Sequence, residues 1–260
     1  METVILDRRG GELRITLNRP DSMNAWDKQL GHDLLAAVRE ATADDVRAVT
    51  ITGAGRAFSS GADLKAGFDP TPEGHPDVLT VLHERYHPII RGLRELPKPV
   101  LAAVNGPAVG IGCSLALTAD LVVARESAYF LLAFVNIGLV PDGGSSLLLP
   151  ERVGFGRAAE MAMLGERVGA RQALEWGLVN RVTPDDEFET AVDELADRLA
   201  NGPTGAYAGI KRQLNAWLFA RMEEQLDLEA EIQQRSAASG DFAEGVTAFL
   251  QKRPAAFGGR

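Results

Sequence analysis

The sequence predicts an α/β fold followed by a mostly helical C-terminal region. Strand and helix patterns alternate through the first half, polar or glycine-rich turns follow several strands, and the pattern becomes almost wholly helical after about residue 190. A recurring strand–turn–helix order is typical of stacked ββα or βαβ units with partly parallel strands. From the pattern alone, the C-terminal helices either complete the same core or form a second layer that mediates oligomerisation.

Short apolar runs bounded by turn residues predict the strands, and apolar residues spaced three to four apart predict the helices. The chain of 260 residues can bury a large core as one big domain or two small ones. The predicted strands are residues 4–6, 13–17, 46–53 and 100–104, and the predicted helices are about 26–43, 78–96, 145–152, 187–200, 205–239 and 241–252.

Composition and charge argue against several classes of protein. The chain carries 36 acidic and 27 basic residues, a formal net charge of −9, whereas general nucleic-acid binding needs a basic surface. A few local lysines and backbone amides could still hold the phosphates of an anionic ligand. No apolar run approaches the roughly 20 residues needed to span a bilayer, so no membrane partner is expected.

The single cysteine, Cys113, cannot form an intrachain disulfide, which favours a reducing compartment. The first ten residues do not show the basic leader and apolar core of a secretory signal. We therefore expect a cytoplasmic protein.

Residues 57–65 (AFSSGADLK) place small side chains directly after the predicted strand 46–53. Small residues let the backbone approach a ligand closely, and a helix that starts near Asp63 would direct free N–H groups at it. The alternative is an ordinary glycine-containing loop capped by Asp63.

Residues 105–115 (NGPAVGIGCSL) repeat this order of strand, small residues and helix, and so offer a second set of unpaired amides. The segment lacks the Lys-Ser/Thr ending of a P-loop, and its spacing fits the dinucleotide fingerprint poorly. Two such sets of amides that converge on one point would make an oxyanion hole.

Residues 137–146 (IGLVPDGGSS) place Asp142 after Pro141, which fixes a turn, and just before the predicted helix 145–152. Asp142 is a good N-cap for that helix. A carboxylate that faces an apolar pocket could instead shuttle a proton. The pattern leaves both interpretations open.

Together these segments resemble the crotonase (enoyl-CoA hydratase/isomerase) superfamily, and the likeness covers essentially the whole chain. It implies a crotonase-like spiral of ββα units that binds acyl-CoA over residues 1–190. It also implies a helical trimerisation region over residues 191–260 and a homotrimer or dimer of trimers. The matching motifs are 17–20 (LNRP), 23–25 (MNA), 58–64 (FSSGADL), 98–100 (KPV) with 105–106 (NG), Gly138 with 141–144 (PDGG), Ala173 with 176–179 (WGLV), and 248–253 (AFLQKR).

Carried over residue by residue, the resemblance assigns the oxyanion hole for the thioester to the amides of Ala62 and Ile111. The substrate would be a coenzyme A thioester, with no permanently bound cofactor. Phe249 also matches a position that meets CoA, although a core aromatic is the interpretation we favour for it. The CoA-binding residues implied by the resemblance are Ala62, Asp63, Leu64, Lys65 and Lys252.

Departures from the hydratase pattern indicate the reaction. Hydratases of this superfamily place two glutamates around a water, and those positions are Ser114 and Phe134 here. Asp142 instead resembles the aspartate of isomerase members, which predicts an acyl-CoA isomerase with Asp142 as acid/base. The likeness is greatest to 2-(1,2-epoxy-1,2-dihydrophenyl)acetyl-CoA isomerases, over residues 86–104, 134–144 and 248–260. Hydration, dehalogenation by an aspartate that attacks a ring, and non-catalytic acyl-CoA binding are the alternatives.

No His, Cys or carboxylate grouping has the spacing of metal ligands, so no metal is expected. His83 and His87 lie four apart on a predicted helix, and we expect an exposed or capping role for them. Cys113 lies among small helix residues and is expected to be a buried packing residue.

Overall fold

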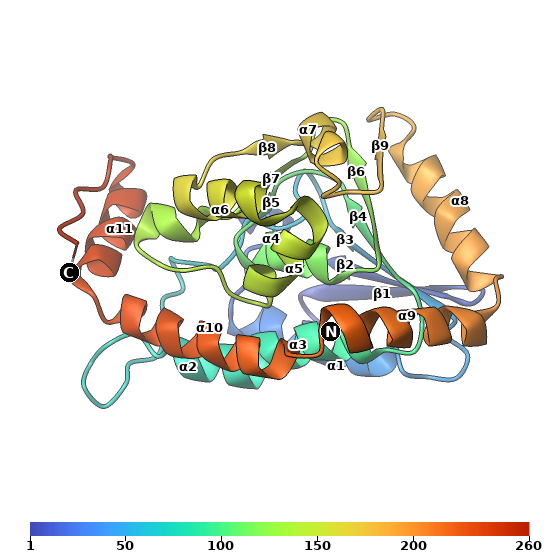
Figure 1. The fold of residues 1–260 in the computed structure, drawn as a ribbon, viewed down its shortest axis with the longest axis horizontal. Coiled ribbons are helices and arrows are strands. Elements are labelled where there is room, and N and C mark those ends of the chain that lie inside the picture. Colours follow the sequence, from blue (N-terminus) through green and yellow to red (C-terminus); the bar gives the residue numbers. More distant parts are fainter. Residues whose placement is uncertain (260) are drawn as a thin grey trace.

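A six-stranded sheet forms the centre of the molecule in a computed structural model that describes residues 1–259 (Figure 1). Its strand order is β1-β2-β3-β4-β6-β9. β1 and β2 are antiparallel, and each later pair of neighbours is parallel. The strands are β1 (Val4–Arg9), β2 (Glu12–Leu17), β3 (Ala48–Gly53), β4 (Val100–Val104), β6 (Leu121–Arg125) and β9 (Arg181–Thr183).

A second, three-stranded sheet begins directly beyond β4. It contains β5 (Ala108–Val109), β7 (Tyr129–Leu131) and β8 (Val168–Gly169), in the order β5-β7-β8. β5 pairs parallel with β7, and β7 pairs antiparallel with β8. Between β4 and β9 the chain therefore alternates between the two sheets.

Helices surround both sheets, and their sequences show why they form. At α1 (Lys28–Glu40), the Asp27 carboxylate accepts a hydrogen bond of 2.8 Å from the Leu30 amide and so caps the helix. Leu30, Leu34 and Val38 repeat every four residues and are buried, which gives the helix one apolar face. The remaining helical elements are η1 (Pro20–Ser22), α2 (Val78–Val81), η2 (Leu82–Tyr86), α3 (His87–Glu95), α4 (Ile111–Thr118), η3 (Ala133–Ile137), α5 (Ser145–Val153), α6 (Phe155–Leu164), α7 (Ala170–Glu175), α8 (Phe188–Ala200), α9 (Thr204–Leu218), α10 (Met222–Ala237) and α11 (Gly240–Gln251).

The central sheet is covered on both faces. Leu13, Ile15 and Ile51 join the large core with α1, α3 and α4. Leu101 lies on the opposite face of the sheet and joins a smaller core with Phe188 of α8. Figure 1 shows α8 beside the sheet on the right, with α9 and α10 along the lower edge of the molecule. The C-terminal helices thus help to complete the fold of this chain.

The expected alternation of strands and helices is confirmed, but the helix expected near Asp63 is wrong. The Asp63 amide donates a hydrogen bond of 3.0 Å to the Trp26 carbonyl, and the chain makes only a short turn after Asp63. Gly67 then adopts a left-handed φ of 71°, which ends the turn.

Two long predicted helices are interrupted. The segment 78–96 contains the π-helical η2, because Pro88 has no N–H to donate back to Glu84 and the hydrogen-bond ladder changes register. The segment 205–239 is broken into α9 and α10 at Phe219, whose ring packs against the guanidinium of Arg94, 5.0 Å from its centroid.

Within residues 1–259, no helix is both long enough and apolar enough to cross a membrane.

Candidate active site

Two glycine-containing turns run side by side at the junction of the sheets. The Ser59 amide donates to the Pro107 carbonyl at 3.0 Å, and the Val109 amide donates to the Ser59 carbonyl at 2.9 Å. This parallel bridge pairs Ser59 with Ala108, and continuing its register brings Ala62 opposite Ile111. The spacing of the two segments therefore brings the two predicted amide positions together.

Glycine is required where these backbones meet. Gly61 has a φ of 90°, and a Cβ there would lie 2.9 Å from the carbonyl oxygen of Val109. Such a contact is closer than real Cβ atoms make, so a larger side chain would push the two turns apart. Gly61 thus sets the close approach of the segments that carry Ala62 and Ile111.

The amides of Ala62 and Ile111 have no protein acceptor among residues 1–259. Trp26 bonds to the Gly61 carbonyl and the Asp63 amide, so the N–H of Ala62 between them is directed away from Trp26. Ile111 is the first residue of α4, where an N–H has no intrahelical acceptor. Two free donors that border the same cavity can hold one carbonyl oxygen and stabilise negative charge on it.

The cavity beside these amides has a volume of about 530 Å³ and is lined mainly by apolar side chains. Its size falls in the range of small-molecule sites. Polar groups are few along its wall, so a polar group that faces it is poorly solvated. The lining residues that matter for the chemistry are Ala62, Ile111, Tyr86, Phe134, Asp142 and Gln233.

Asp142 lies in the loop between η3 and α5 and is only 4% exposed. Its Oδ2 accepts a hydrogen bond of 2.8 Å from Nε2 of Gln233, while its Oδ1 has no hydrogen-bond partner among the described residues. The N-cap interpretation is wrong, because Gly144 occupies the N-cap of α5 with a φ of 78°. The left-handed Gly143 before it turns the chain so that the Asp142 side chain borders the cavity instead.

Burial is the main cause of an unusual acidity at this carboxyl. Burial and, to a smaller extent, the negative charge of Glu229 raise the pKa of Asp142, the hydrogen bond from Gln233 lowers it, and the net result is a pKa of about 8. A carboxyl with a pKa near neutral can both accept and return a proton.

A polar stripe on α10, formed by Gln225, Glu229 and Gln233, holds the Asp142 loop. Glu229 accepts hydrogen bonds from the Gly144 amide at 2.7 Å and the Ser146 amide at 3.0 Å. Gln225 donates to the Ser146 hydroxyl at 2.8 Å. Burial raises the pKa of Glu229, its hydrogen bonds with Ser146 and Gly144 oppose this effect, and the net result is a pKa of about 7.

The sequence analysis missed this stripe. Its members lie four residues apart, which places them on one face of a helix, and two of them are buried polar residues. That regular spacing of polar residues within a predicted helix was the one sign in the sequence that they share a face. The partners of the stripe, more than 75 residues away along the chain, could not be identified from it.

Ser114 and Phe134, which the resemblance matches to the hydratase glutamates, have different surroundings in the structure. The hydroxyl of Ser114, fully buried in α4, donates to the main-chain oxygen of Asp142 at 2.8 Å. Phe134 is 7% exposed and forms part of the cavity wall. One position thus supports the loop and the other makes the pocket apolar.

The predicted CoA-binding residues do not all lie together. Ala62 and Leu64 line the cavity. Asp63, whose Oδ2 lies 3.1 Å from the Arg19 guanidinium, is not among the residues that line it. Lys65 and Lys252 are exposed and also lie outside the cavity wall. Phe249 is 57% exposed and borders the cavity, so the core interpretation of this residue is wrong.

The remaining candidates lie away from the cavity. Cys113 is fully buried, as expected, and burial raises the pKa of its thiol to about 12. His87 is also buried, which lowers its pKa to about 4, so an exposed or capping role is wrong for it. Among residues 1–259, no group of three or more His, Cys, Asp or Glu side chains could hold a metal ion.

Comparison with known proteins places this site in a family. A family model described as enoyl-CoA hydratase/isomerase matches residues 7–260. The chain belongs to the enoyl-CoA hydratase/isomerase family. Enzymes of this crotonase family act on CoA thioesters without a permanently bound cofactor.

Solved structures confirm the predicted fold. The chain matches the crystal structure of an enoyl-CoA hydratase from Mycobacterium avium subsp. paratuberculosis with a TM-score of 0.90. The two are 40% identical, and the match covers 98% of each chain. The two sheets and C-terminal helices are therefore the α/β crotonase fold.

Two curated relatives have different named activities. A protein named probable enoyl-CoA hydratase from Rhodobacter capsulatus is 46% identical over 246 residues, 95% of this chain and 94% of the relative. The 1,2-epoxyphenylacetyl-CoA isomerase of Escherichia coli is 39% identical over 262 residues, 100% of both chains. Overall similarity thus establishes the family, and it does not single out the ring-epoxide isomerases.

Proposed function

We propose that this chain is an acyl-CoA isomerase that shifts a double bond or rearranges a ring epoxide through a thioester enolate, with Asp142 as acid/base. The observation that carries the proposal is the unpaired Oδ1 of Asp142 beside a cavity that is also bordered by Ala62 and Ile111. The family resemblance matches Ser114 and Phe134 to the two hydratase glutamates. Phe134 lines the cavity, and Ser114 supports the loop that carries Asp142.

The amides of Ala62 and Ile111 would hold the thioester oxygen. As Asp142 removes a proton from a substrate carbon, negative charge moves to that oxygen, where the two N–H donors stabilise it. Loss of one donor in an oxyanion hole typically costs about 3–4 kcal/mol. Asp142 then returns the proton to a different carbon, so one acid/base group completes a double-bond shift, and no water has to be activated.

For the CoA part of the substrate, we retain Ala62, Asp63, Leu64, Lys65 and Lys252 as the proposed contacts. Leu64 borders the cavity near Ala62, which supports a role next to the thioester. Lys65 and Lys252 are exposed cations, which could meet the negatively charged phosphates of CoA outside the cavity.

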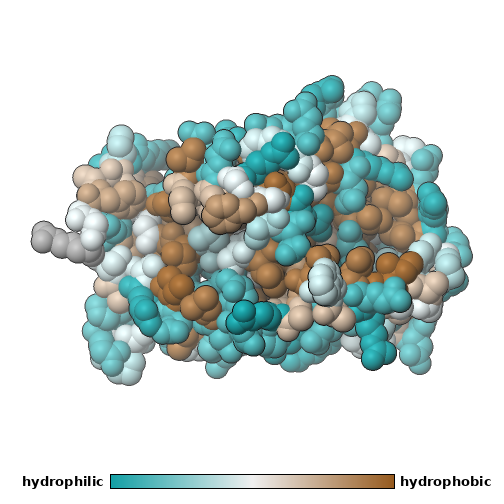
Figure 2. All heavy atoms as spheres, in the orientation of Figure 1, coloured by the Kyte–Doolittle hydropathy of each residue, from teal (hydrophilic) through white to brown (hydrophobic). Residues whose placement is uncertain are grey.

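The assembly proposed is a homotrimer or dimer of trimers, with residues 1–190 as the acyl-CoA-binding core and 191–260 as the oligomerisation region. Trp217, Ile210 and Leu214 on α9 are 85%, 53% and 52% exposed. Figure 2 shows hydrophobic side chains gathered around this part of the surface. Light scattering at micromolar concentration should give a trimer or hexamer, and a monomer would contradict this assembly.

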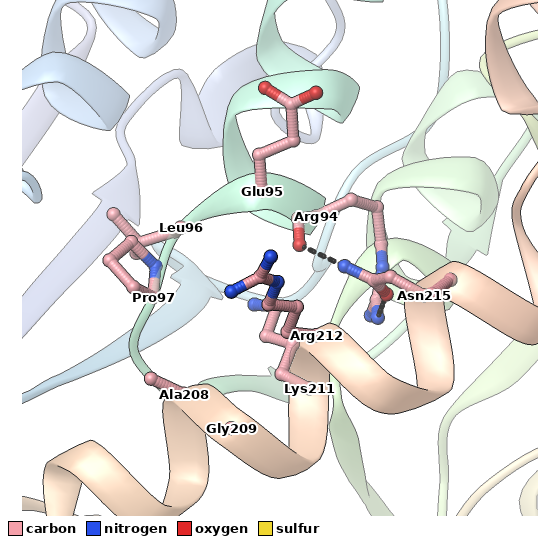
Figure 3. A pocket seen from close by; sticks show the side chains of 10 residues that line it. Arg94, Glu95, Leu96, Pro97, Ala208, Gly209, Lys211, Arg212 and Asn215 are labelled. Carbon is pink, nitrogen blue, oxygen red and sulfur yellow. Dashed lines mark hydrogen bonds between the residues drawn. The ribbon is translucent and has the colours of Figure 1, made fainter.

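A groove of about 610 Å³ adds to this surface, between the end of α3 and α9. Figure 3 shows its floor, where the Asn215 side chain donates to the main-chain oxygen of Arg94 at 2.7 Å. A groove beside exposed apolar side chains is the kind of surface that another subunit can cover.

Enoyl-CoA hydration is the second candidate, because the relative at 46% identity is named a probable hydratase. Product analysis with a panel of enoyl-CoA and ring-epoxide thioesters distinguishes isomerisation from hydration. We expect isomerised thioesters and little hydrated product. Efficient hydration of crotonyl-CoA by the unmodified protein would contradict the proposal, and no turnover of any thioester would favour a non-catalytic binding protein. The cytoplasmic location stays a prediction.

A further inference from the structure

Gln233 of α10 makes a hydrogen bond at each end of its amide. Its Oε1 accepts from the Val140 amide at 2.9 Å, and its Nε2 donates to Oδ2 of Asp142 at 2.8 Å. The side chain is 1% exposed, so water does not compete for either bond. Because the Val140 N–H can only donate, the oxygen of Gln233 must face Val140 and its NH₂ group must face Asp142.

This arrangement makes the two oxygens of Asp142 unequal. Oδ2 accepts a hydrogen bond whether the carboxyl is ionised or neutral, so a proton on the neutral acid belongs on Oδ1. Oδ1 is also the oxygen that has no partner among the described residues. The same atom is therefore the base in the ionised form and the acid in the neutral form.

We propose that Gln233 is a positioning residue that restricts proton transfer to Oδ1 of Asp142 and fixes the plane of its carboxyl group toward the substrate. This inference rests on the proposed role of Asp142 as acid/base, and it adds a residue from the C-terminal region to the machinery of the site. It gives α10 a function in the reaction as well as in the fold.

The surroundings of Asp142 determine how its titration responds to loss of Gln233. The titratable groups that face it are Glu229 from α10 and Tyr86 from η2, and Arg253 borders the same cavity. α4 contributes the uncharged hydroxyl of Ser114. Gln233 supplies the hydrogen bond that favours the ionised form, so its removal should raise the pKa of Asp142.

Gln233→Met removes both hydrogen bonds at similar side-chain size. The test measures kcat, KM and the pH profile with the thioester that the wild-type enzyme converts fastest. We expect kcat to fall about 10- to 100-fold, because misplacement of a reacting group by about 1 Å can cost that much. KM should change less than threefold, and the acidic limb of the kcat profile, where Asp142 must be ionised to take the proton, should move to higher pH by about one unit.

Gln225→Met is the matched control. Gln225 lies on the same face of α10 and holds the same loop through Ser146, but it does not bond to Asp142. If the loop attachment alone matters, both variants should lose activity alike with unchanged pH profiles, and the proposal would be overturned. We expect Gln225→Met to stay within about threefold of the wild-type kcat at every pH.

A second variant protects the test against misfolding. Gln233→Leu removes both hydrogen bonds with a side chain of different shape, so it should show the same upward movement of the pH profile. A folded Gln233→Leu or Gln233→Met enzyme with the wild-type profile would refute the positioning role, even if Asp142→Asn is inactive. An active Asp142→Asn enzyme would instead refute the proposed function itself.

Discussion

The two sides of the cavity are built in different ways. The side of Ala62 and Ile111 consists of main-chain N–H groups, brought together by glycine turns at the ends of neighbouring strands. The side of Asp142 consists of side chains, held by a helix almost 90 residues further along the chain. One side depends on backbone geometry, and the other depends on side-chain chemistry.

This difference determines which substitutions each side tolerates. A main-chain donor survives a change of side chain, whereas a change of φ or loss of the N–H removes it. A buried carboxyl and its hydrogen-bond donors, in contrast, lose their function when a single atom changes. The comparison can therefore be tested with substitutions that affect one side and spare the other.

Asp142→Asn should have the largest effect. The substitution keeps the shape of the side chain and the hydrogen bond from Gln233, but it removes the group that accepts a proton. We expect turnover to fall by about 10²–10⁴, the usual contribution of a general acid–base group, with thioester binding largely intact. Steady-state kinetics and equilibrium titration measure the two quantities. A loss smaller than about tenfold would contradict the assignment of Asp142.

Ala62→Pro tests the main-chain side. Proline deletes the N–H proposed to hold the oxyanion, so we expect turnover to fall about 10²- to 10³-fold. Ala62→Gly keeps the N–H and should cost only a few-fold. Comparing the two variants tests the backbone role directly, because Ala62→Gly changes the side chain and leaves the N–H donor in place.

A circular dichroism melt must accompany the Ala62 variants, since a misfolded proline variant would be uninformative. Near-normal activity in a folded Ala62→Pro enzyme would place the oxyanion hole elsewhere. Ile111→Gly serves as a comparison on the second turn. It keeps the N–H, so we expect retained chemistry, with a packing loss of about 2–5 kcal/mol because Ile111 is buried.

The sequence could predict the main-chain side because its signals are local. Segments 57–65 and 105–115 each follow a strand and contain the glycine that the close approach requires, so their meeting follows from neighbouring parallel strands. The choice of Ala62 and Ile111 as the donors within these segments, like the role of Asp142, came from the family resemblance. The pattern at Asp142 alone also fitted an N-cap, and the left-handed Gly143 and Gly144 decide between the two.

The role of α10 could not be predicted in the same way. Its polar stripe looks like an ordinary solvated helix face in the sequence, and only the packing of α10 against α5 buries it. The helix interruption at Phe219 was not predicted for a similar reason, because its tertiary contact with Arg94 outweighed periodicity there. The π-helical segment before Pro88 has a local cause instead, the missing N–H of the proline.

Stability should depend on pH through the same buried carboxyls. Burial holds the pKa of Asp142 at about 8 and that of Glu229 at about 7, above the values of about 4 for an unfolded chain. Between about pH 4 and 8 the folded state binds more protons than the unfolded state, so stability falls as pH rises through this window. The decline ends above the folded pKa of Asp142.

Asp142→Asn removes the loss of folding stability that comes from ionising this buried carboxyl. At pH 8 we expect a gain of about 5 kcal/mol, which is set by the rise of the Asp142 pKa from about 4 to about 8, or about 10–20 °C in the midpoint of thermal unfolding for a chain of this size. At pH 4 the gain should nearly vanish. Calorimetry at both pH values measures it, with Glu166→Gln at an exposed carboxyl as the control. An equal gain at both pH values would show that the charge of Asp142 is not the cause.

Ser114→Glu should have the smallest effect, measured as gain of hydratase activity. The substitution restores a carboxylate at one hydratase position, but Phe134 still fills the other, so a water would lack its second carboxylate. There is also little room for a larger side chain at position 114. Ser114 is fully buried with its hydroxyl 2.8 Å from the main-chain oxygen of Asp142, and a Cβ on Gly143 would lie 3.0 Å from the Cβ of Ser114.

A glutamate at position 114 therefore displaces the loop that carries Asp142, on the side of the cavity that depends on side-chain chemistry. We expect crotonyl-CoA hydration to rise by less than about threefold, and isomerisation to fall because the acid/base group moves. Assay of both reactions on one preparation separates the outcomes. A large gain of hydration with isomerisation intact would mean that the loop accommodates a second carboxylate, and that the two sides of the cavity are less different than the contacts of α10 indicate.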